Sequence, residues 1–457
     1  MKSFKLTIFA LTIGIALFAA SQVKAATEFI SIIDPDNAAG TDYTSLSAWE
    51  NAVQADLTAT STLVFSYSTA SGTIPDGATV VGQQSGAIAS STHMTASTSP
   101  GTSQIMLTNI SGTFQAGEQV YVQSTGASST YVILSNSGDS VIAVAKCRST
   151  GGTADTNAVT IDGWTTSADN YIKVWTDPDD PYGRHNGKWD EGKYRLEVGH
   201  SSGITIGSNV DYVRIQGIQI SLNLNYASDL AGIAINDIQN DSEYEISQCV
   251  LKEISSSYVR YGGIFLSYVA GTVNRKAYIW GNIFYDFKNS TYPARSVYIG
   301  DNDWTVYIYN NTVYNSLVGY NGYGTVIAKN NIAQNCGSTC YYGTFSSDSD
   351  YNISSDGTAP GAHSKASTTV KFLDATNNDF HLDPTDTAAR NAGTSSPLTD
   401  SNLSFYTDID GTTRGSAWDI GADEVPVEYV STICENTSAG GDCATADYHR
   451  LYDWEAD

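Results

Sequence analysis

The sequence predicts an all-β protein whose central part is a β-solenoid, with a small β domain inserted near its N-terminus. Short runs of Val, Ile, Tyr and Thr alternate with Gly, Asn, Asp and Ser, which is typical of many short strands joined by turns. One unit recurs along the middle of the chain, and Asn returns at one position of that unit. Helical periodicity after the first 25 residues is confined to one short stretch.

The N-terminus predicts export. Lys2 and Lys5 precede an apolar run from Leu6 to Ala20, and Val23 to Ala25 has the pattern of a cleavage site, so we expect a signal peptide over residues 1–25, cut after Ala25. An uncleaved anchor is the alternative, but the run is shorter than the roughly 20 residues that span a bilayer. We expect a secreted or cell-surface protein with no transmembrane segment in the mature chain.

Charge and composition exclude two classes of protein. The 457 residues include 23 Lys and Arg against 48 Asp and Glu, a formal net charge of −25. Such a chain repels phosphate backbones, which excludes a nucleic-acid-binding protein. A hydrophobic content of 41 %, with 29 Tyr, excludes a disordered chain, because a sizeable core can be buried.

Residues 26–75 are predicted to form an N-terminal cap and the first coils. The helical stretch lies here: Leu46, Trp49 and Ala52 share one face behind a Thr44-Ser45 cap.

The small β domain is predicted over residues 76–146. Gly77-Ala-Thr-Val-Val, followed by Ser85-Gly86-Ala87, recurs 40 residues later as Gly117-Glu-Gln-Val-Tyr, followed by Thr125-Gly126-Ala127. This segment is rich in Ser, Thr and Gly and nearly free of charge. We expect it to project from the solenoid.

The solenoid is predicted over residues 147–400. Two apolar residues separated by a polar turn recur with spacings of 31, 33, 29, 20 and 21 residues, the last copy being weaker. Each coil of a solenoid buries its inward side chains on the coils above and below it. The copies begin at Ile215, Ile246, Ile279, Ile308 and Ala328, and the weak copy centres on Asn352.

Four asparagines share one column of this repeat: Asn282, Asn311, Asn331 and Asn352. Stacked Asn side chains bond to each other and to the turn backbone, so we expect a structural ladder. The alternative is that Asn is simply a common turn residue.

The end of the chain resembles its beginning. Glu428-Tyr-Val-Ser resembles Glu28-Phe-Ile-Ser, and a second match follows at nearly the same offset. We expect a closing segment over residues 401–426 and the start of a truncated second module over 427–457, as in a tandem array.

Residues from about 200 to 360 resemble right-handed parallel β-helix repeat proteins, the pectate-lyase-like superfold. The stretches Asp379-Phe-His-Leu, Asp408-Ile-Asp-Gly and Asp419-Ile-Gly-Ala-Asp-Glu resemble the closing segment of bacterial surface β-helix proteins that carry assorted C-terminal anchors. The resemblance implies a right-handed parallel β-helix. It says little about chemistry, because this fold supports lyases, hydrolases, epimerases and adhesins.

Catalytic residues are not evident. The motifs of polygalacturonase-like hydrolases and of pectate-lyase-like enzymes are absent. The densest charged and aromatic stretch, residues 177–195, offers Asp179, Asp180 and His185 as acid and base candidates. The alternative is a solvated loop.

Calcium is the cofactor that these loops suit. Asp177 with Asp179, and Asp408 with Asp410, place carboxylates at alternate loop positions, and Ca²⁺ takes oxygen ligands. The Asp408 stretch equally fits an Asx turn.

The cysteines predict two local disulfides in an oxidising compartment, Cys336–Cys340 and Cys434–Cys443. Cys147 and Cys249 either pair across the fold or remain buried thiols.

Aromatic residues are the strongest functional clue. Sixteen tyrosines lie between Tyr244 and Tyr351, and alternation along strands points some outward. A row of exposed rings suits a polysaccharide or cell-surface glycan; the alternative is that the rings fill the solenoid. The expected carbohydrate-binding residues are Trp280, Tyr285, Trp304, Tyr307, Tyr309 and Tyr314.

We therefore expect an adhesin-like or carbohydrate-contacting surface protein without catalytic activity. One alternative is a polysaccharide lyase or glycoside hydrolase acting in a groove of the solenoid. A purely structural repeat stalk is another.

Overall fold

The computed structural model describes residues 25–95, 103–223, 230–236, 241–254, 261–268, 274–288 and 294–426. Residues 1–24 of the expected signal peptide and the whole expected second module, with Cys434 and Cys443, lie outside this range. Within the described residues no helix has the length and apolar character to cross a membrane.

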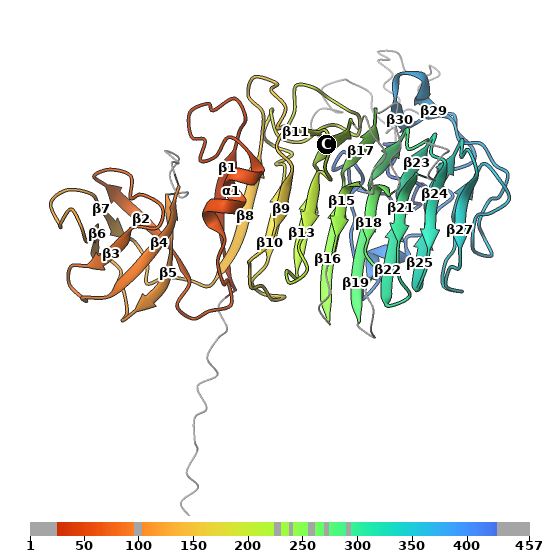
Figure 1. The fold of residues 1–457 in the computed structure, drawn as a ribbon. Coiled ribbons are helices and arrows are strands. Elements are labelled where there is room, and N and C mark those ends of the chain that lie inside the picture. Colours follow the sequence, from red (N-terminus) through yellow and green to blue (C-terminus); the bar gives the residue numbers. More distant parts are fainter. Residues whose placement is uncertain are drawn as a thin grey trace, which may run out of the picture.

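The chain is nearly all β, and its main body is a β-helix-like solenoid (Figure 1). Its coils stack on one another, so that their strands form three parallel sheets. Sheet 1 contains β1 (Thr27–Ile33), β8 (Val141–Cys147), β10 (Ile172–Trp175), β13 (Val213–Gln216), β16 (Ser242–Ser247), β19 (Arg275–Trp280), β22 (Trp304–Tyr309) and β25 (Thr325–Lys329). Sheet 2 contains β11 (Arg195–Val198), β14 (Gln219–Leu222), β17 (Val250–Glu253), β20 (Ile283–Tyr285), β23 (Thr312–Tyr314), β26 (Ile332–Gln334) and β28 (Ile353–Ser354). Sheet 3 contains β9 (Val159–Ile161), β12 (Ile204–Ile206), β15 (Ala231–Ile235), β18 (Gly262–Leu266), β21 (Arg295–Ile299), β24 (Val318–Gly322) and β27 (Thr339–Gly343).

The sequence repeat corresponds to one coil of this solenoid. Ile215 pairs with Ile246, which pairs with Ile279 in the next coil, and the register continues through Ile308 to Ala328. The four isoleucines are buried in one continuous core, and Ala328 is also buried. Each coil thus supplies the apolar surface that its neighbours need.

The asparagine column forms a buried ladder at the turn between sheets 1 and 2. Asn282 Nδ2 donates to Oδ1 of Asn311 at 2.9 Å, and Asn311 Nδ2 donates to Oδ1 of Asn331 at 3.0 Å. Asn331 Nδ2 donates to Oδ1 of Asn352, also at 3.0 Å. The same oxygens accept the backbone N–H of the preceding asparagine, so each rung satisfies a buried turn.

The solenoid begins with β1 and α1 (Leu46–Val53). Ser45 caps this helix by accepting the N–H of Ala48, and Leu46 and Trp49 are buried in the main core. The expected helix and its cap are therefore present.

The inserted domain is a closed six-stranded barrel. Its strands are β2 (Leu63–Ala70), β3 (Thr79–Gly82), β4 (Ile88–Met94), β5 (Gln104–Ser111), β6 (Gln119–Val122) and β7 (Tyr131–Leu134). The two copies of the upstream repeat meet in it, because β3 pairs with β6. The boundaries expected at 76 and 146 differ from the structure at both ends: β2 belongs to the barrel, and β8 pairs in parallel with β1.

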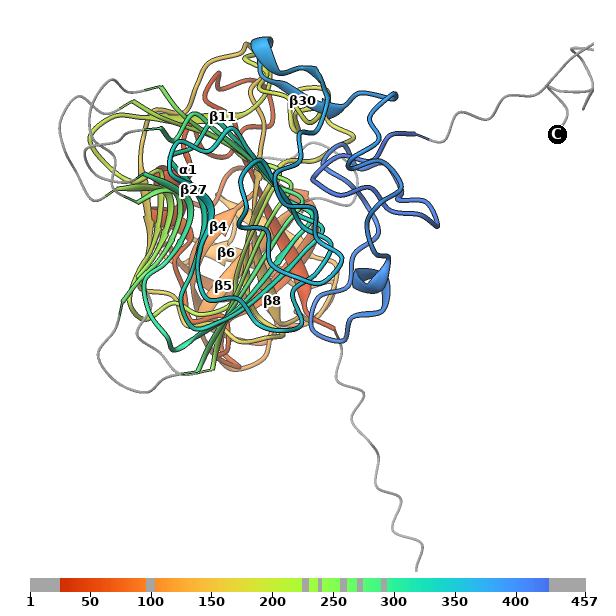
Figure 2. The same cartoon turned by 90° about the vertical axis from the view of Figure 1, so that its right-hand side faces the viewer.

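After β28 the chain turns back along the outside of the solenoid. This closing segment, residues 370–426, contains β29 (Phe372–Asp374), η1 (Ala375–Asn377), β30 (Asp379–Leu382) and η2 (Ser396–Thr399). It begins before the expected residue 401, because Phe372 and Phe380 already pack on the outer face of sheet 2. Viewed along the solenoid, the closing segment lies on one side and β27 of sheet 3 on the other (Figure 2).

Candidate functional site

The charged loop between β10 and β11 does not assemble the expected acid–base group. His185 is buried, its Nε2 lies 3.0 Å from the carbonyl oxygen of Gln248, and its Nδ1 accepts the N–H of Gly187. Burial, together with the neighbouring Arg184 guanidinium, lowers the pKa of His185 to about 3. The expectation that His185 is a catalytic residue is therefore corrected: the ring is held neutral in a structural position.

The acids of this loop line an open groove of about 400 Å³ with Lys146 and Arg148. Asp177 Oδ2 pairs with Lys146 Nζ at 2.6 Å, while its Oδ1 accepts the N–H of Asp179 at 2.9 Å. Asp180 lines the same groove and accepts the N–H of Tyr182. The structure thus brings Asp177, Asp179 and Asp180 together, but a lysine already neutralises the first of them.

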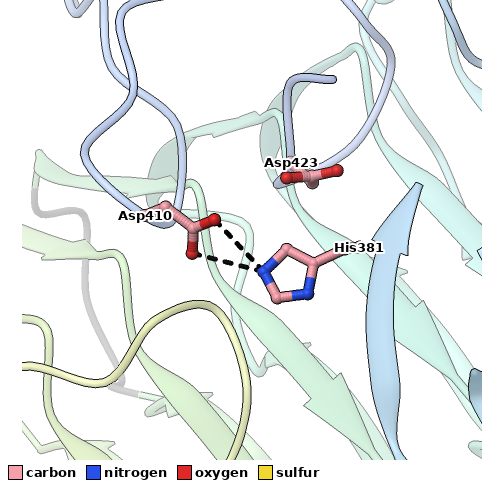
Figure 3. A group of neighbouring side chains, drawn as sticks. All are labelled: His381, Asp410 and Asp423. Atoms are coloured by element: carbon pink, nitrogen blue, oxygen red, sulfur yellow. Dashed lines mark hydrogen bonds and ion pairs between the residues drawn. The ribbon is translucent and has the colours of Figure 1, made fainter. Parts of the chain in front are cut away.

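The two carboxylates of the second expected calcium pair have different partners. Asp408 accepts the N–H groups of Asp410, Thr412 and Glu424, so its carboxylate closes an Asx turn. Asp410 instead lies beside His381 and Asp423, and one donor atom from each lies within 4.8 Å of the others (Figure 3). Asp410 therefore belongs to a cluster that includes an imidazole, while calcium binding by the Asp408 loop stays a prediction.

Burial and crowded acids perturb this region. Burial opposes protonation of His381, but Asp410, Asp423 and Asp379 outweigh it and raise the pKa of His381 to about 10. Burial raises the pKa of Asp423 to about 6, and burial together with Asp410 raises the pKa of Asp408 to about 7. The carboxylates of this region therefore outnumber the positive charges that neutralise them.

The six expected sugar-contacting rings do not form one exposed row. Trp280, Tyr285, Trp304 and Tyr309 are buried. Trp304 points into the solenoid and donates from Nε1 to the carbonyl of Ser267. The expectation of exposure is corrected for these four residues.

Five of the six do point away from the solenoid core, and the closing segment covers them to different extents. Phe405 stacks on Trp280 with ring centres 4.4 Å apart, and Asp400 accepts the hydroxyl of Tyr309 at 2.9 Å. Phe380 packs on Tyr285 and on Tyr314. Tyr307 and Tyr314 keep partial exposure.

Exposed rings occur instead on the outer face of sheet 3. Phe265, Tyr298, Asn321 and Tyr342 are consecutive partners in the parallel register of β18, β21, β24 and β27. Phe265 and Tyr298 are partly exposed between buried core residues, and Tyr342 is 50 % exposed. One column of the sheet therefore has three rings on its outer face, with the buried Asn321 between two of them.

Further rings extend this column. Tyr261 stacks on Phe265 with ring centres 3.9 Å apart and planes 5° apart. The guanidinium of Arg295 lies 4.3 Å from the ring centre of Tyr298. Tyr268, after β18, is 70 % exposed. We call Tyr261, Phe265, Tyr298, Asn321 and Tyr342 the sheet 3 row.

Asn321 is the polar member of this row. Only 1 % of its surface is exposed, yet within the described structure neither its Oδ1 nor its Nδ2 has a hydrogen-bond partner. Burying an amide without a hydrogen-bond partner lowers the free energy of unfolding by about 1–3 kcal/mol.

The sequence contained a signal for this row. When the coils are aligned on their third strand, Phe265, Tyr298 and Tyr342 fall in one column. The third strand has no motif that recurs from coil to coil, because the residues next to the aromatic position vary and the flanking loops differ in length.

The structure joins Cys336 and Cys340 in a disulfide, while Cys147 and Cys249 are separate buried thiols.

Comparisons with protein-family models, with curated proteins and with solved structures find no match for this chain.

Proposed function

We propose that this protein is an exported, non-catalytic surface protein that holds a polysaccharide against the sheet 3 row. The observation that carries the proposal is the register of that row, in which four consecutive coils place a ring at three positions and one unpaired amide at the other.

The geometry of the row suits an extended sugar chain. Neighbouring parallel strands lie about 4.8 Å apart, so alternate positions of the row are about 10 Å apart, close to the length of a disaccharide. Aromatic faces contact the CH-rich faces of sugar rings, and tyrosine hydroxyls bond to sugar hydroxyls. The Asn321 amide is buried between two of the rings, so its donor and acceptor meet a sugar hydroxyl only when Tyr298 or Tyr342 shifts aside.

The charge of the chain favours a neutral glycan. A formal net charge of −25 repels polyanions over a distance of about 10 Å at moderate salt. Arg295 already stacks on Tyr298, so we count it as part of the aromatic surface. We infer export from the expected signal peptide. We also propose that the solenoid is a right-handed β-helix of the pectate-lyase-like type.

The test uses the mature chain, residues 26–457, with insoluble neutral and acidic polysaccharides. Retention on the polymer and release of new reducing ends are measured in the same samples. We expect retention on a neutral polymer without new ends. Tyr298→Ala and Tyr342→Ala should each weaken retention about tenfold, equivalent to about 1.4 kcal/mol.

The matched control is Tyr406→Ala. Tyr406 is 61 % exposed but lies in the closing segment, so its loss should leave retention unchanged. Equal loss in all three variants would reject the sheet 3 row as the contact surface. New reducing ends would make the protein an enzyme, and absence of retention on every polymer would favour a structural stalk.

A further inference from the structure

We propose that His381, Asp410 and Asp423 bind one divalent transition-metal ion, with Zn²⁺ as the reference ion, and that this ion fastens the closing segment together. The three side chains converge from β30 and from two later loops of that segment (Figure 3).

The first pair of donors already has the spacing of two ligands on one ion. His381 Nε2 lies 3.2 Å from Oδ2 and 3.3 Å from Oδ1 of Asp410. Two ligands bound to one zinc ion at about 2.0–2.1 Å in tetrahedral geometry lie about 3.3 Å apart. Asp423 completes the group with a donor atom within 4.8 Å of the other two.

The imidazole is oriented from its other side. Asp379 Oδ1 lies 2.5 Å from His381 Nδ1, and Asp379 Oδ2 lies 3.4 Å from Lys188 Nζ. A carboxylate on the second nitrogen of a metal-binding histidine is the usual supporting arrangement, because it directs the first nitrogen and makes it a better ligand.

Asp423 is held in place by the backbone. Its Oδ2 accepts the N–H of Leu382 at 2.7 Å, and only 5 % of the residue is exposed. A buried carboxylate beside another carboxylate is costly unless a cation balances the charge. In the metal-free chain protonated His381 has this role, and a bound metal ion would take it over when it displaces the proton. Arg414 also lowers the cost from nearby, but its guanidinium bonds to Glu424 and to backbone carbonyls of residues 421 and 422.

Gly187 provides the space beside the donors. A Cβ at this position would collide with His381 Nε2 and with Asp410 Oδ1, and its φ is +64°. The side chains of His381 and Asp410 keep 18 % and 28 % of their surface exposed, so an ion and its remaining water ligands can enter from solvent.

The donor set selects the class of ion. Imidazole nitrogen suits zinc and its neighbours in the first transition row, whereas Ca²⁺ and Mg²⁺ prefer oxygen ligands alone. His381 therefore distinguishes this site from the calcium loops expected from the sequence.

The test measures metal binding to the tag-free mature chain after treatment with a chelator. Zn²⁺ and Ca²⁺ are titrated in parallel by calorimetry, and Co²⁺ by its visible absorption. We expect one Zn²⁺ per chain, Co²⁺ absorption typical of low coordination number, and far weaker binding of Ca²⁺. Bound Zn²⁺ should also raise the melting temperature by mass action.

Variants separate this site from adventitious binding. His381→Gln and Asp410→Asn should abolish Zn²⁺ binding, and Asp379→Asn should weaken it about tenfold. His363→Gln is the matched control, because His363 also pairs with an aspartate, Asp350, at 2.6 Å but is mostly exposed. Circular dichroism checks that each variant is folded.

The proposal fails if folded Asp410→Asn and His381→Gln bind Zn²⁺ like the parent chain, or if the parent binds none at 100-fold molar excess. Ca²⁺ binding as tight as Zn²⁺ binding would overturn the assignment of the ion. If His381→Gln does not fold, two measurements still test the site. They are Zn²⁺ binding by Asp410→Asn, whose substituted side chain is partly exposed, and the change in melting temperature of the parent chain with Zn²⁺.

Discussion

Asn321 is a buried polar side chain that costs the fold free energy, and the proposed polysaccharide contact gives that cost a use. Its amide is buried between Tyr298 and Tyr342 without a partner in the described structure. Folding therefore loses the hydration of that amide and gains no hydrogen bond in return.

Replacing Asn321 with Leu, which is apolar and of similar size, should stabilise the protein by about 1 kcal/mol and weaken retention on the polysaccharide. The free energy of unfolding in denaturant and polymer retention are measured on the same preparation. A variant that is more stable and still binds like the parent would remove Asn321 from the contact surface. A less stable variant would show that the amide has a partner in solution.

His93 links the barrel to the first coil. Its Nδ1 lies 2.7 Å from the hydroxyl of Tyr43 and 3.1 Å from Asp76, and its Nε2 lies 3.5 Å from Asp42. Burial opposes protonation, but the two aspartates outweigh it and raise the pKa of His93.

A pKa that is higher in the folded state makes the stabilisation pH-dependent. The contribution of His93 should be complete below its unfolded pKa of about 6.5 and be lost as the pH rises through the raised folded value. The measurement is the difference in melting temperature between the parent and His93→Gln from pH 5.5 to 9.5. This difference should shrink with rising pH; a constant difference would contradict the charged state. His363→Gln serves as the reference substitution.

At the scale of the element, the paired asparagines of the turns have two separate uses. Asn311 and Asn331 point inward and form the ladder. Their neighbours Asn310 and Asn330 point toward the closing segment, where Asn310 donates to the carbonyls of residues 419 and 421 and Asn330 to that of residue 394. One dipeptide thus stacks the coils and docks the segment that covers them.

Asn311→Ala should destabilise the protein by about 3 kcal/mol, because it leaves the N–H of Asn282 and the carbonyl of Ile279 buried without their partner. Chemical denaturation measures the loss. Asn51→Ala, on the exposed side of α1, is the control and should change stability by less than about 0.5 kcal/mol. Equal effects of the two substitutions would show that the ladder does not hold the coils.

At the scale of the whole molecule, the barrel protects the first edge of the solenoid. β1 is the outermost strand of sheet 1. The side chain of Gln104, from β5, accepts the N–H of Ile30 and donates to the carbonyl of Glu28 at 3.1 and 2.8 Å. The chain enters and leaves the barrel side by side, since Val64 and Asp139 exchange two backbone hydrogen bonds.

Replacing residues 66–137 with a short Gly-Ser turn should therefore leave a folded solenoid that melts at a lower temperature and self-associates through the bare edge of β1. Light scattering after size-exclusion chromatography measures the mass against concentration. Ile30→Pro in the shortened chain removes the exposed N–H and should restore the monomer. A shortened chain that stays monomeric at every concentration would show that this edge is not adhesive.

The sequence by itself determined the stacking of the solenoid and the asparagine ladder. Both depend on residues that recur once per coil and bind their own copies in the next coil, so the period that is visible in the sequence is the period of the contacts. The disulfide between Cys336 and Cys340 follows from closeness along the chain.

Only the tertiary structure decided which faces are covered and which side chains meet. The closing segment docks on sheets 1 and 2 through contacts between residues far apart in sequence, so Trp280 and Tyr309 are buried although strand alternation points them outward. The same docking brings His381 to Asp410, 29 residues later, and leaves the rings of the sheet 3 row partly exposed. Such contacts depend on the path of the whole chain, and no local pattern of residues encodes that path.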